Sequence, residues 1–134
     1  GAEIIYIHPE ADLHPARTLQ KIIDAGARPG IAINPGTSVS AVDELFHLTD
    51  YLLVMTVNPG FAGQKYLDFV DVKIKKLAAL KEKFGFEMVA DGAISLQRIA
   101  ALSGMGVKGF VLGTSSLFGK GRSYEEIIPE LRAL

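Results

Sequence analysis

The sequence predicts an α/β fold in which βα units repeat around a parallel sheet. Three observations support this class. Short apolar runs alternate with amphipathic stretches, each run is nearly continuous in apolar residues, and polar or glycine-rich residues follow each run. Continuous apolar runs are typical of strands that are covered on both faces, and the alternation is typical of parallel sheets. Because no linker or low-complexity segment divides the chain, we expect a single domain over residues 1–134.

The elements follow from these patterns in chain order. The predicted strands are Ile4–Ile7, Gly30–Ile33, Tyr51–Val57, Phe86–Ala90 and Gly109–Leu112. The first helix, Pro15–Asp24, places Ala16, Leu19, Ile22 and Ile23 on one face, and Gly26 stops it. Ser38 or Ser40 is a candidate cap for the next helix, with Val42, Leu45 and Phe46 as its apolar stripe.

The remaining helices carry clearer boundary signals. The longest, Asp68–Lys83, is expected to bury Val70, Ile74, Leu77 and Leu80 and to expose its lysines, among them Lys73, before Gly85 ends it. Ser95 is expected to cap a short helix. Ser123 and Glu126 have the spacing of a capping box ahead of a last helix.

Composition narrows the classes of function. The 134 residues are 49% hydrophobic and 22% charged, and 14 basic side chains against 15 acidic ones give a net charge of -1. This balance argues against disorder and offers no basic surface for nucleic acid or an anionic membrane. No apolar run approaches the roughly 18 residues of a spanning helix. The absence of cysteine excludes disulfides and thiolate chemistry, and without a secretory leader we expect a cytoplasmic protein.

The ends of the strands carry the candidate chemistry, because the carboxyl ends of parallel strands converge on one face. Gly113-Thr114-Ser115-Ser116 follows the last strand, Gly92 follows the fourth, and Gly60 to Gly63 follow the third. Backbone N–H groups in such loops can cradle an anion, which predicts a phosphate ester as ligand. The alternative is a set of ordinary glycine turns with capping hydroxyls.

Four further side chains are candidates for this site. Asp91 ends an apolar strand, where a partly desolvated carboxylate can serve as a general acid or base or as a metal ligand; a simple Asp-Gly turn is the alternative. His8 and Glu10 stand two residues apart and could hydrogen-bond or form a ligand pair, although a structural histidine is the commoner case. Met55 either lines the site or fills the core.

The run Val54-Met55-Thr56-Val57-Asn58-Pro59-Gly60-Phe61-Ala62-Gly63-Gln64 resembles the signature of the ribulose-phosphate 3-epimerase family. Members of that family are (β/α)8 TIM barrels that invert the carbon-3 centre of ketose phosphates. Other motifs agree with the family in order and spacing: His8-Pro9-Glu10, Asn34-Pro35 with Thr37, Asp91-Gly92 and Gly113-Thr114-Ser115. The resemblance covers the whole chain but matches only strands 4 to 8, which implies an incomplete barrel.

The resemblance also implies a mechanism. In the family two aspartates transfer protons through a metal-stabilised enediolate, and the seventh-strand aspartate corresponds to Asp91, as acid or base and as ligand of a divalent metal ion (Zn, Fe, Mn or Co). The second aspartate and two histidine ligands belong to strands that have no counterpart in this sequence. We therefore expect the isolated chain to bind phosphate weakly and to be inactive, and we expect the open sheet to pair with upstream residues or with another copy in a homo-oligomer.

The residues that would bind the sugar phosphate by this resemblance lie in three loops and one strand. They are Met55, Gly60, Phe61, Ala62, Gly63, Gly92, Ala93, Gly113 and Thr114. Ala62 and Ala93 stand where family members often have glycine, and alanine restricts φ. The loops are similar to the allulose-6-phosphate branch, so the expected substrates are ribulose 5-phosphate and xylulose 5-phosphate, or allulose 6-phosphate and fructose 6-phosphate.

Two other functions compete with the epimerase. A phosphate-binding barrel lyase, such as the hexulose-phosphate synthase group, needs a lysine at a strand end, and Lys65 lies beyond the loop of the third strand. A non-catalytic half-barrel would serve only as a structural or oligomerisation module.

Overall fold

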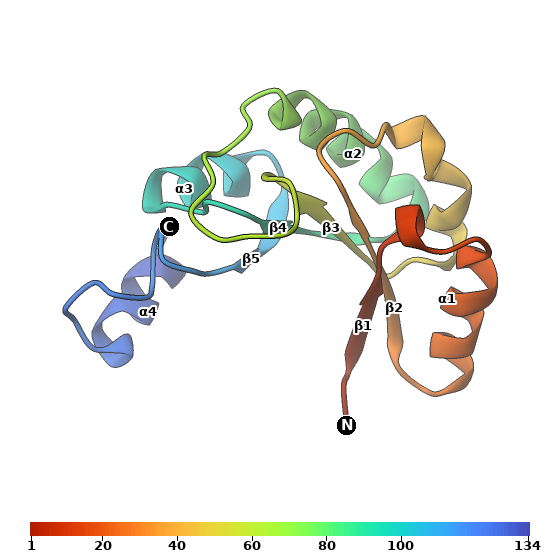
Figure 1. The fold of residues 1–134 in the computed structure, drawn as a ribbon, viewed down its shortest axis with the longest axis horizontal. Coiled ribbons are helices and arrows are strands. Elements are labelled where there is room, and N and C mark those ends of the chain that lie inside the picture. Colours follow the sequence, from red (N-terminus) through yellow and green to blue (C-terminus); the bar gives the residue numbers. More distant parts are fainter.

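The computed structural model describes residues 1–134 and contains one sheet of five parallel strands (Figure 1). The strands are β1 (Ile4–Ile7), β2 (Arg28–Ile33), β3 (Tyr51–Met55), β4 (Glu87–Asp91) and β5 (Val107–Val111). Their order in the sheet is their order in the chain. This is an α/β fold, as the sequence predicts, and it forms part of a TIM barrel in which β1 and β5 are the two edges.

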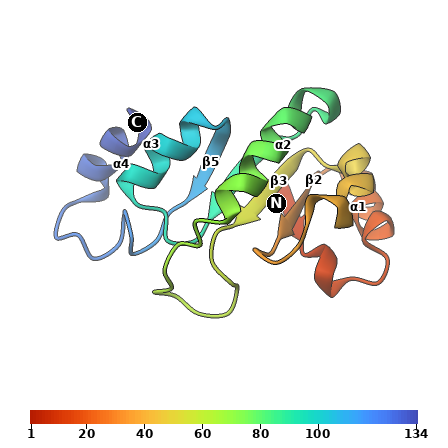
Figure 2. The same cartoon turned by 90° about the horizontal axis from the view of Figure 1, so that it is seen from above.

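Helices connect the strands and pack along one side of the sheet (Figure 2). The α-helices are α1 (Pro15–Asp24), α2 (Val70–Phe84), α3 (Leu96–Gly104) and α4 (Tyr124–Arg132). Short 3-10 segments lie at η1 (Pro9–Ala11), η2 (Val39–Ala41) and η3 (Asp43–Leu48). No helix has the length and apolar character that crossing a membrane requires.

The predicted boundary signals of the last three helices are confirmed. Gly85 ends α2 with a φ of 79°, in the left-handed region that favours glycine. The Ser95 hydroxyl accepts a hydrogen bond from the backbone N–H of Arg98 at the start of α3. Ser123 and Glu126 form the capping box of α4. These local signals fix helix boundaries because each one satisfies backbone groups that the helix itself leaves unpaired.

The main core lies between the sheet and the helices. It is a cluster of 20 buried residues, including Ile31 and Ile33 of β2 and Leu52 and Val54 of β3. Alternate residues of a strand point to opposite faces, so these side chains share the outer face of the sheet. The rings of Phe46 and Phe86 are 5.1 Å apart within this cluster. Apolar burial of this extent supplies most of the stability of a small domain.

Some predicted elements are wrong in detail. The second predicted helix is two 3-10 segments, and Ser38 makes no side-chain cap bond. The stretch is too short for an α-helix to propagate over several turns, so tighter i to i+3 turns form instead. Of the four residues predicted to form the apolar face of α1, Leu19 and Ile22 are buried, whereas Ala16 and Ile23 are exposed.

The predicted exposure of Lys73 is also wrong. Its ammonium group reaches from α2 to the end of β2 and donates to the backbone carbonyls of Asn34 and Pro35, at 2.8 Å each. Burial lowers the pKa of Lys73, with the nearby Glu10 acting in the opposite direction. A long lysine side chain can therefore bind backbone carbonyls of another element, even at a position where the helical pattern predicts exposure to solvent.

Candidate active site

A hollow of about 680 Å³ lies at the carboxyl ends of the strands, on the face opposite the main core. This volume is within the usual range for a small-molecule site. Every site residue predicted from the sequence lines it: Met55, Gly60, Phe61, Ala62, Gly63, Asp91, Gly92, Ala93, Gly113 and Thr114. The structure thus brings together residues from three separate loops and two strands.

The register of the sheet explains how Asp91 meets Met55. Met55 and Asp91 end neighbouring strands and are direct partners in the β3–β4 pairing. Met55, like Leu53 two residues before it, belongs to a small cluster on the inner face of the sheet. The two-residue period of a strand places both side chains beneath the hollow.

Sequence reasoning missed part of the lining, although the period could have identified it. Tyr6, Ala32 and Leu53 line the hollow from the inner faces of β1, β2 and β3. Each follows from the two-residue period once one inward residue of its strand is known, as Met55 identifies Leu53. These residues give the hollow an apolar floor, whereas its rim is built from the glycine-containing loops.

Asp91 is the one carboxylate among the lining residues. Burial raises the pKa of Asp91 above its ordinary value, and no ion pair or side-chain hydrogen bond with the rest of the chain opposes this effect. A carboxyl group with a raised pKa and free oxygens is suited to exchange a proton with a bound ligand. The geometry is therefore that of a candidate acid or base.

The loop after β4 presents unpaired backbone donors to the hollow. Neither Gly92 nor Ala93 donates its amide N–H to another part of the chain. Both have positive φ, 126° for Gly92 and 52° for Ala93, which is the one non-glycine residue in that region. The alanine therefore keeps the left-handed conformation that glycine would adopt readily, at some cost in backbone strain.

The loop after β5 is a turn built around one carbonyl. The Gly113 carbonyl accepts hydrogen bonds from the N–H groups of Ser116, Leu117 and Phe118. The N–H groups of Gly113 and Thr114 donate to no acceptor in the chain. No arginine or lysine lines the hollow. An anion bound here would be held by backbone dipoles rather than by cationic side chains.

His8 and Glu10 do not act as a side-chain pair toward the hollow. Strand β1 ends at Ile7, and the His8 Nδ1 atom lies 3.7 Å from the Glu10 carboxylate, beyond hydrogen-bonding distance. Glu10 instead accepts bonds from the Asn34 N–H at 2.7 Å and the Thr37 hydroxyl at 2.6 Å. Burial alone would raise the pKa of Glu10, but these two bonds outweigh it and lower the pKa. Glu10 therefore joins the ends of β1 and β2.

The residues present do not by themselves make a metal centre. The chain has no group of three His, Cys, Asp or Glu side chains placed to hold a metal ion. Asp91 contributes one oxygen donor group, whereas metal sites in proteins use several ligands. The expected divalent ion therefore stays a prediction.

The parallel α/β sheet, with helices on its outer side and glycine loops at the carboxyl ends of its strands, places the chain in the class of (β/α)8-barrel folds. Comparison with known proteins narrows this class. The model of the Ribulose-phosphate 3 epimerase family matches residues 1–118. The chain belongs to this family.

Three curated relatives carry the name ribulose-phosphate 3-epimerase. The protein of Rhodobacter capsulatus is 38% identical over 127 residues, which are 95% of this chain and 55% of the relative. That of Aquifex aeolicus is 38% identical over 121 residues, 89% of this chain and 54% of the relative. That of Escherichia coli K12 is 35% identical over 135 residues, 99% of this chain and 59% of the relative. The chain therefore spans little more than half the length of these relatives.

Proposed function

We propose that this chain binds a ketose phosphate and contributes to epimerisation at carbon 3, with Asp91 as one of the two groups that transfer the proton. The observation that carries the proposal is the position of Asp91, whose raised pKa and unpaired carboxylate face the same hollow as the free amides of the glycine loops. The similarity to proteins named ribulose-phosphate 3-epimerase supports this reaction class.

Different residues would bind the phosphate end and the sugar end of the substrate. The N–H groups of Gly92 and Gly113 would bind the phosphate, and the apolar floor near Met55 would hold the sugar chain and exclude water. Asp91 would remove the proton from carbon 3, next to the ketone, to give an enediolate, or return one to it. Inversion requires a second acid or base on the opposite side of the carbon, and Asp91 is the only carboxylate that lines the hollow.

Several finer features belong to the same proposal. The substrates are ribulose 5-phosphate and xylulose 5-phosphate, or allulose 6-phosphate and fructose 6-phosphate. Asp91 is in addition one ligand of a divalent metal ion, which when bound would polarise the oxygens of the substrate. Residues 1–134 act as one domain in a cytoplasmic homo-oligomer. The lack of a lysine in the lining favours an epimerase over a lyase.

Amide chemical shifts in the chain, measured during separate titrations with inorganic phosphate, xylulose 5-phosphate and fructose 6-phosphate, test the binding site. We expect the signals of Gly92, Ala93, Gly113 and Thr114 to move with all three ligands. The better ketose phosphate should bind more tightly than phosphate alone, because it also contacts the apolar floor. Shifts confined to surface lysines would contradict the proposed site.

Deuterium uptake from solvent at carbon 3 tests the reaction, with added divalent metal. We expect the chain alone to be inactive, because it presents one carboxylate to the substrate. Any uptake that does occur should disappear in Asp91→Asn, which keeps the size of the side chain but not its basicity. Uptake that persists in this variant would overturn the role of Asp91.

A further inference from the structure

The loop that joins β3 to α2 forms one wall of the hollow but makes few bonds of its own. Residues 57–65 donate or accept no backbone–backbone hydrogen bond. The Gln64 amide bonds to the carbonyls of Asn58 and Phe61, at 2.6 and 2.9 Å, and these are the only hydrogen bonds within the tip. Phe61 at the tip is 74% exposed. The position of this loop must therefore be set at its base.

One side of the base is tied to β4. The Thr56 N–H donates to the Asp91 carbonyl at 2.9 Å, and the Thr56 hydroxyl donates to the carbonyls of Asp91 and Gly92. The Leu67 N–H in turn donates to the Thr56 carbonyl at 2.9 Å, which brings the two ends of the loop together. Thr56 is fully buried, so these bonds are shielded from water.

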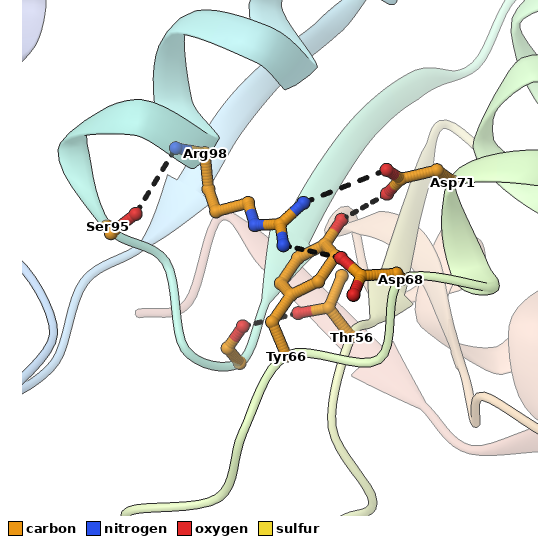
Figure 3. Close-up of polar contacts among 7 residues, drawn as sticks. Thr56, Tyr66, Asp68, Asp71, Ser95 and Arg98 are labelled. Carbon is orange, nitrogen blue, oxygen red and sulfur yellow. Dashed lines mark hydrogen bonds and ion pairs between the residues drawn. The ribbon is translucent and has the colours of Figure 1, made fainter.

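The other side of the base is tied to α3 by a cluster of four side chains, here called the Arg98 cluster: Tyr66, Asp68, Asp71 and Arg98 (Figure 3). The guanidinium carbon of Arg98 lies 3.8 Å from the centroid of the Tyr66 ring. The Tyr66 hydroxyl donates to Asp71 at 2.6 Å. Arg98 pairs with Asp68 and lies 3.8 Å from the Asp71 carboxylate.

The cluster has features that a mobile surface ion pair lacks. Its guanidinium is both stacked on a ring and paired with carboxylates, a combination that uses the planar shape of arginine. Burial, followed by the bond to Asp71, raises the pKa of the Tyr66 hydroxyl, so this hydroxyl stays protonated as a donor. Two carboxylates surround one cation, and without Arg98 they would repel each other.

The position of Arg98 links the cluster to the site. Its backbone N–H is held by Ser95 in the first turn of α3, directly after the loop of Gly92 and Ala93. The cluster therefore connects the wall formed by residues 57–65 to the loop that carries the free amides of the hollow.

We propose that Arg98 is a positioning residue, which fixes the base of loop 57–65 over the hollow by stacking on Tyr66 and pairing with Asp68 and Asp71. The effect on a bound sugar phosphate rests on the proposed function, whereas the effect on the loop does not.

The test compares Arg98→Met with a matched control at the opposite end of the sheet. Arg28 has similar partners: it lies 4.5 Å above the Tyr51 ring, donates to the Tyr51 hydroxyl at 2.6 Å and pairs with Asp50 at 3.2 Å. Arg28→Met therefore removes the same kinds of interaction far from the loop.

Two measurements without ligand report on the loop. Native-state cleavage by chymotrypsin after Phe61, followed by mass spectrometry, reports how often the loop opens, and 15N order parameters of residues 60–63 report its fast motion. We expect Arg98→Met to raise the cleavage rate about tenfold and to lower the order parameters. Arg28→Met should change neither. Tyr66→Phe, which keeps the ring but not the hydroxyl, should give an intermediate rate.

Equal cleavage rates and order parameters in folded Arg98→Met and Arg28→Met would overturn the proposal. If Arg98→Met does not fold, an unchanged loop in Tyr66→Leu, which removes the ring on which Arg98 stacks, would overturn it equally. A titration with xylulose 5-phosphate separates the two hypotheses. A loosened loop in a chain that binds no sugar phosphate would support the positioning role and contradict the proposed function, and an unchanged loop in a chain that binds it would do the reverse.

Discussion

Leu52 and Leu53 are neighbours in β3, yet they face surroundings of different kinds. Leu52 is fully buried in the large core between the sheet and the helices. Leu53 points to the inner face, where a cluster of three buried residues lies beneath the hollow. Helices lie along the outer face of the sheet, as Figures 1 and 2 show. Stability therefore depends mainly on one face of the sheet, and the chemistry that we propose depends on the other.

Substitution of these two leucines should give the largest difference in stability between the two faces of the sheet. We expect Leu52→Ala to lower the free energy of unfolding by roughly 3 kcal/mol, because it leaves a cavity in a close-packed core. Leu53→Ala should cost roughly 1 kcal/mol, because one side of the residue already borders the hollow. Urea denaturation of both variants provides the measurement. Equal losses would show that the inner face is packed as tightly as the outer one.

Substitution of Gly92 tests how closely the loop after β4 is packed at the edge of the hollow. A Cβ atom at this position would lie 2.6 Å from Val57 Cγ2 and 2.9 Å from the Val57 backbone nitrogen, and the φ of +126° is unfavourable for alanine. We expect Gly92→Ala to cost about 2 kcal/mol of unfolding free energy. Gly113→Ala is the control, because nothing lies within 4 Å of its added Cβ, and it should stay within about 0.5 kcal/mol. If both variants lose the same stability, close packing of Gly92 against Val57 is not what shapes the site.

Substitution of the Asp91 and Glu10 carboxylates should change the free energy of unfolding by smaller amounts, and the two changes should have opposite signs at pH 7. The pKa of Asp91 is raised in the folded chain, so its native form keeps a proton that the unfolded chain has already released, and its contribution to stability falls as the pH rises above the ordinary value of 3.8. Asp91→Asn should therefore be slightly more stable than the unchanged protein at pH 7. This advantage should vanish when the pH falls below the ordinary pKa of an aspartate carboxyl group.

Glu10 should behave in the reverse way, because its pKa is lowered from 4.5 by its bonds to Asn34 and Thr37. Its stabilisation is present above pH 4.5 and is lost as the pH falls through the folded pKa. Glu10→Gln should therefore be less stable at pH 7, with a difference that shrinks on acidification. Urea curves of both variants at pH 3 to 7 provide the measurement. Parallel pH profiles would contradict the assignment of Asp91 to an unpaired, partly buried site.

The features that the sequence could predict are those that depend on neighbours in the chain. All five strands, the four α-helices and the caps at Ser95 and Ser123 follow from apolar periodicity and local hydrogen bonding. The hollow could also be predicted in outline, because the carboxyl ends of parallel strands converge and each carries a glycine or a polar residue.

The features that could not be predicted depend on partners far apart in the sequence. Lys73 looks solvent-exposed on its helix but binds carbonyls at the end of β2. Arg98 reaches Asp68, 30 residues away, and nothing in the local pattern of either residue indicates the pairing. The 3-10 segments between β2 and β3 carry an apolar spacing that a short α-helix would share, so periodicity alone could not distinguish them.

The carboxyl 13C signal of Asp91, followed while xylulose 5-phosphate or fructose 6-phosphate is added, tests the central claim most directly. Inorganic phosphate serves as the control, because it can occupy the glycine loops without reaching the carboxylate. We expect phosphate to move only the amide signals of those loops, and at least one ketose phosphate to move the Asp91 carboxyl signal and its titration midpoint as well. A ketose phosphate that binds at the loops and leaves both unchanged would show that Asp91 is not placed beside the reacting carbon.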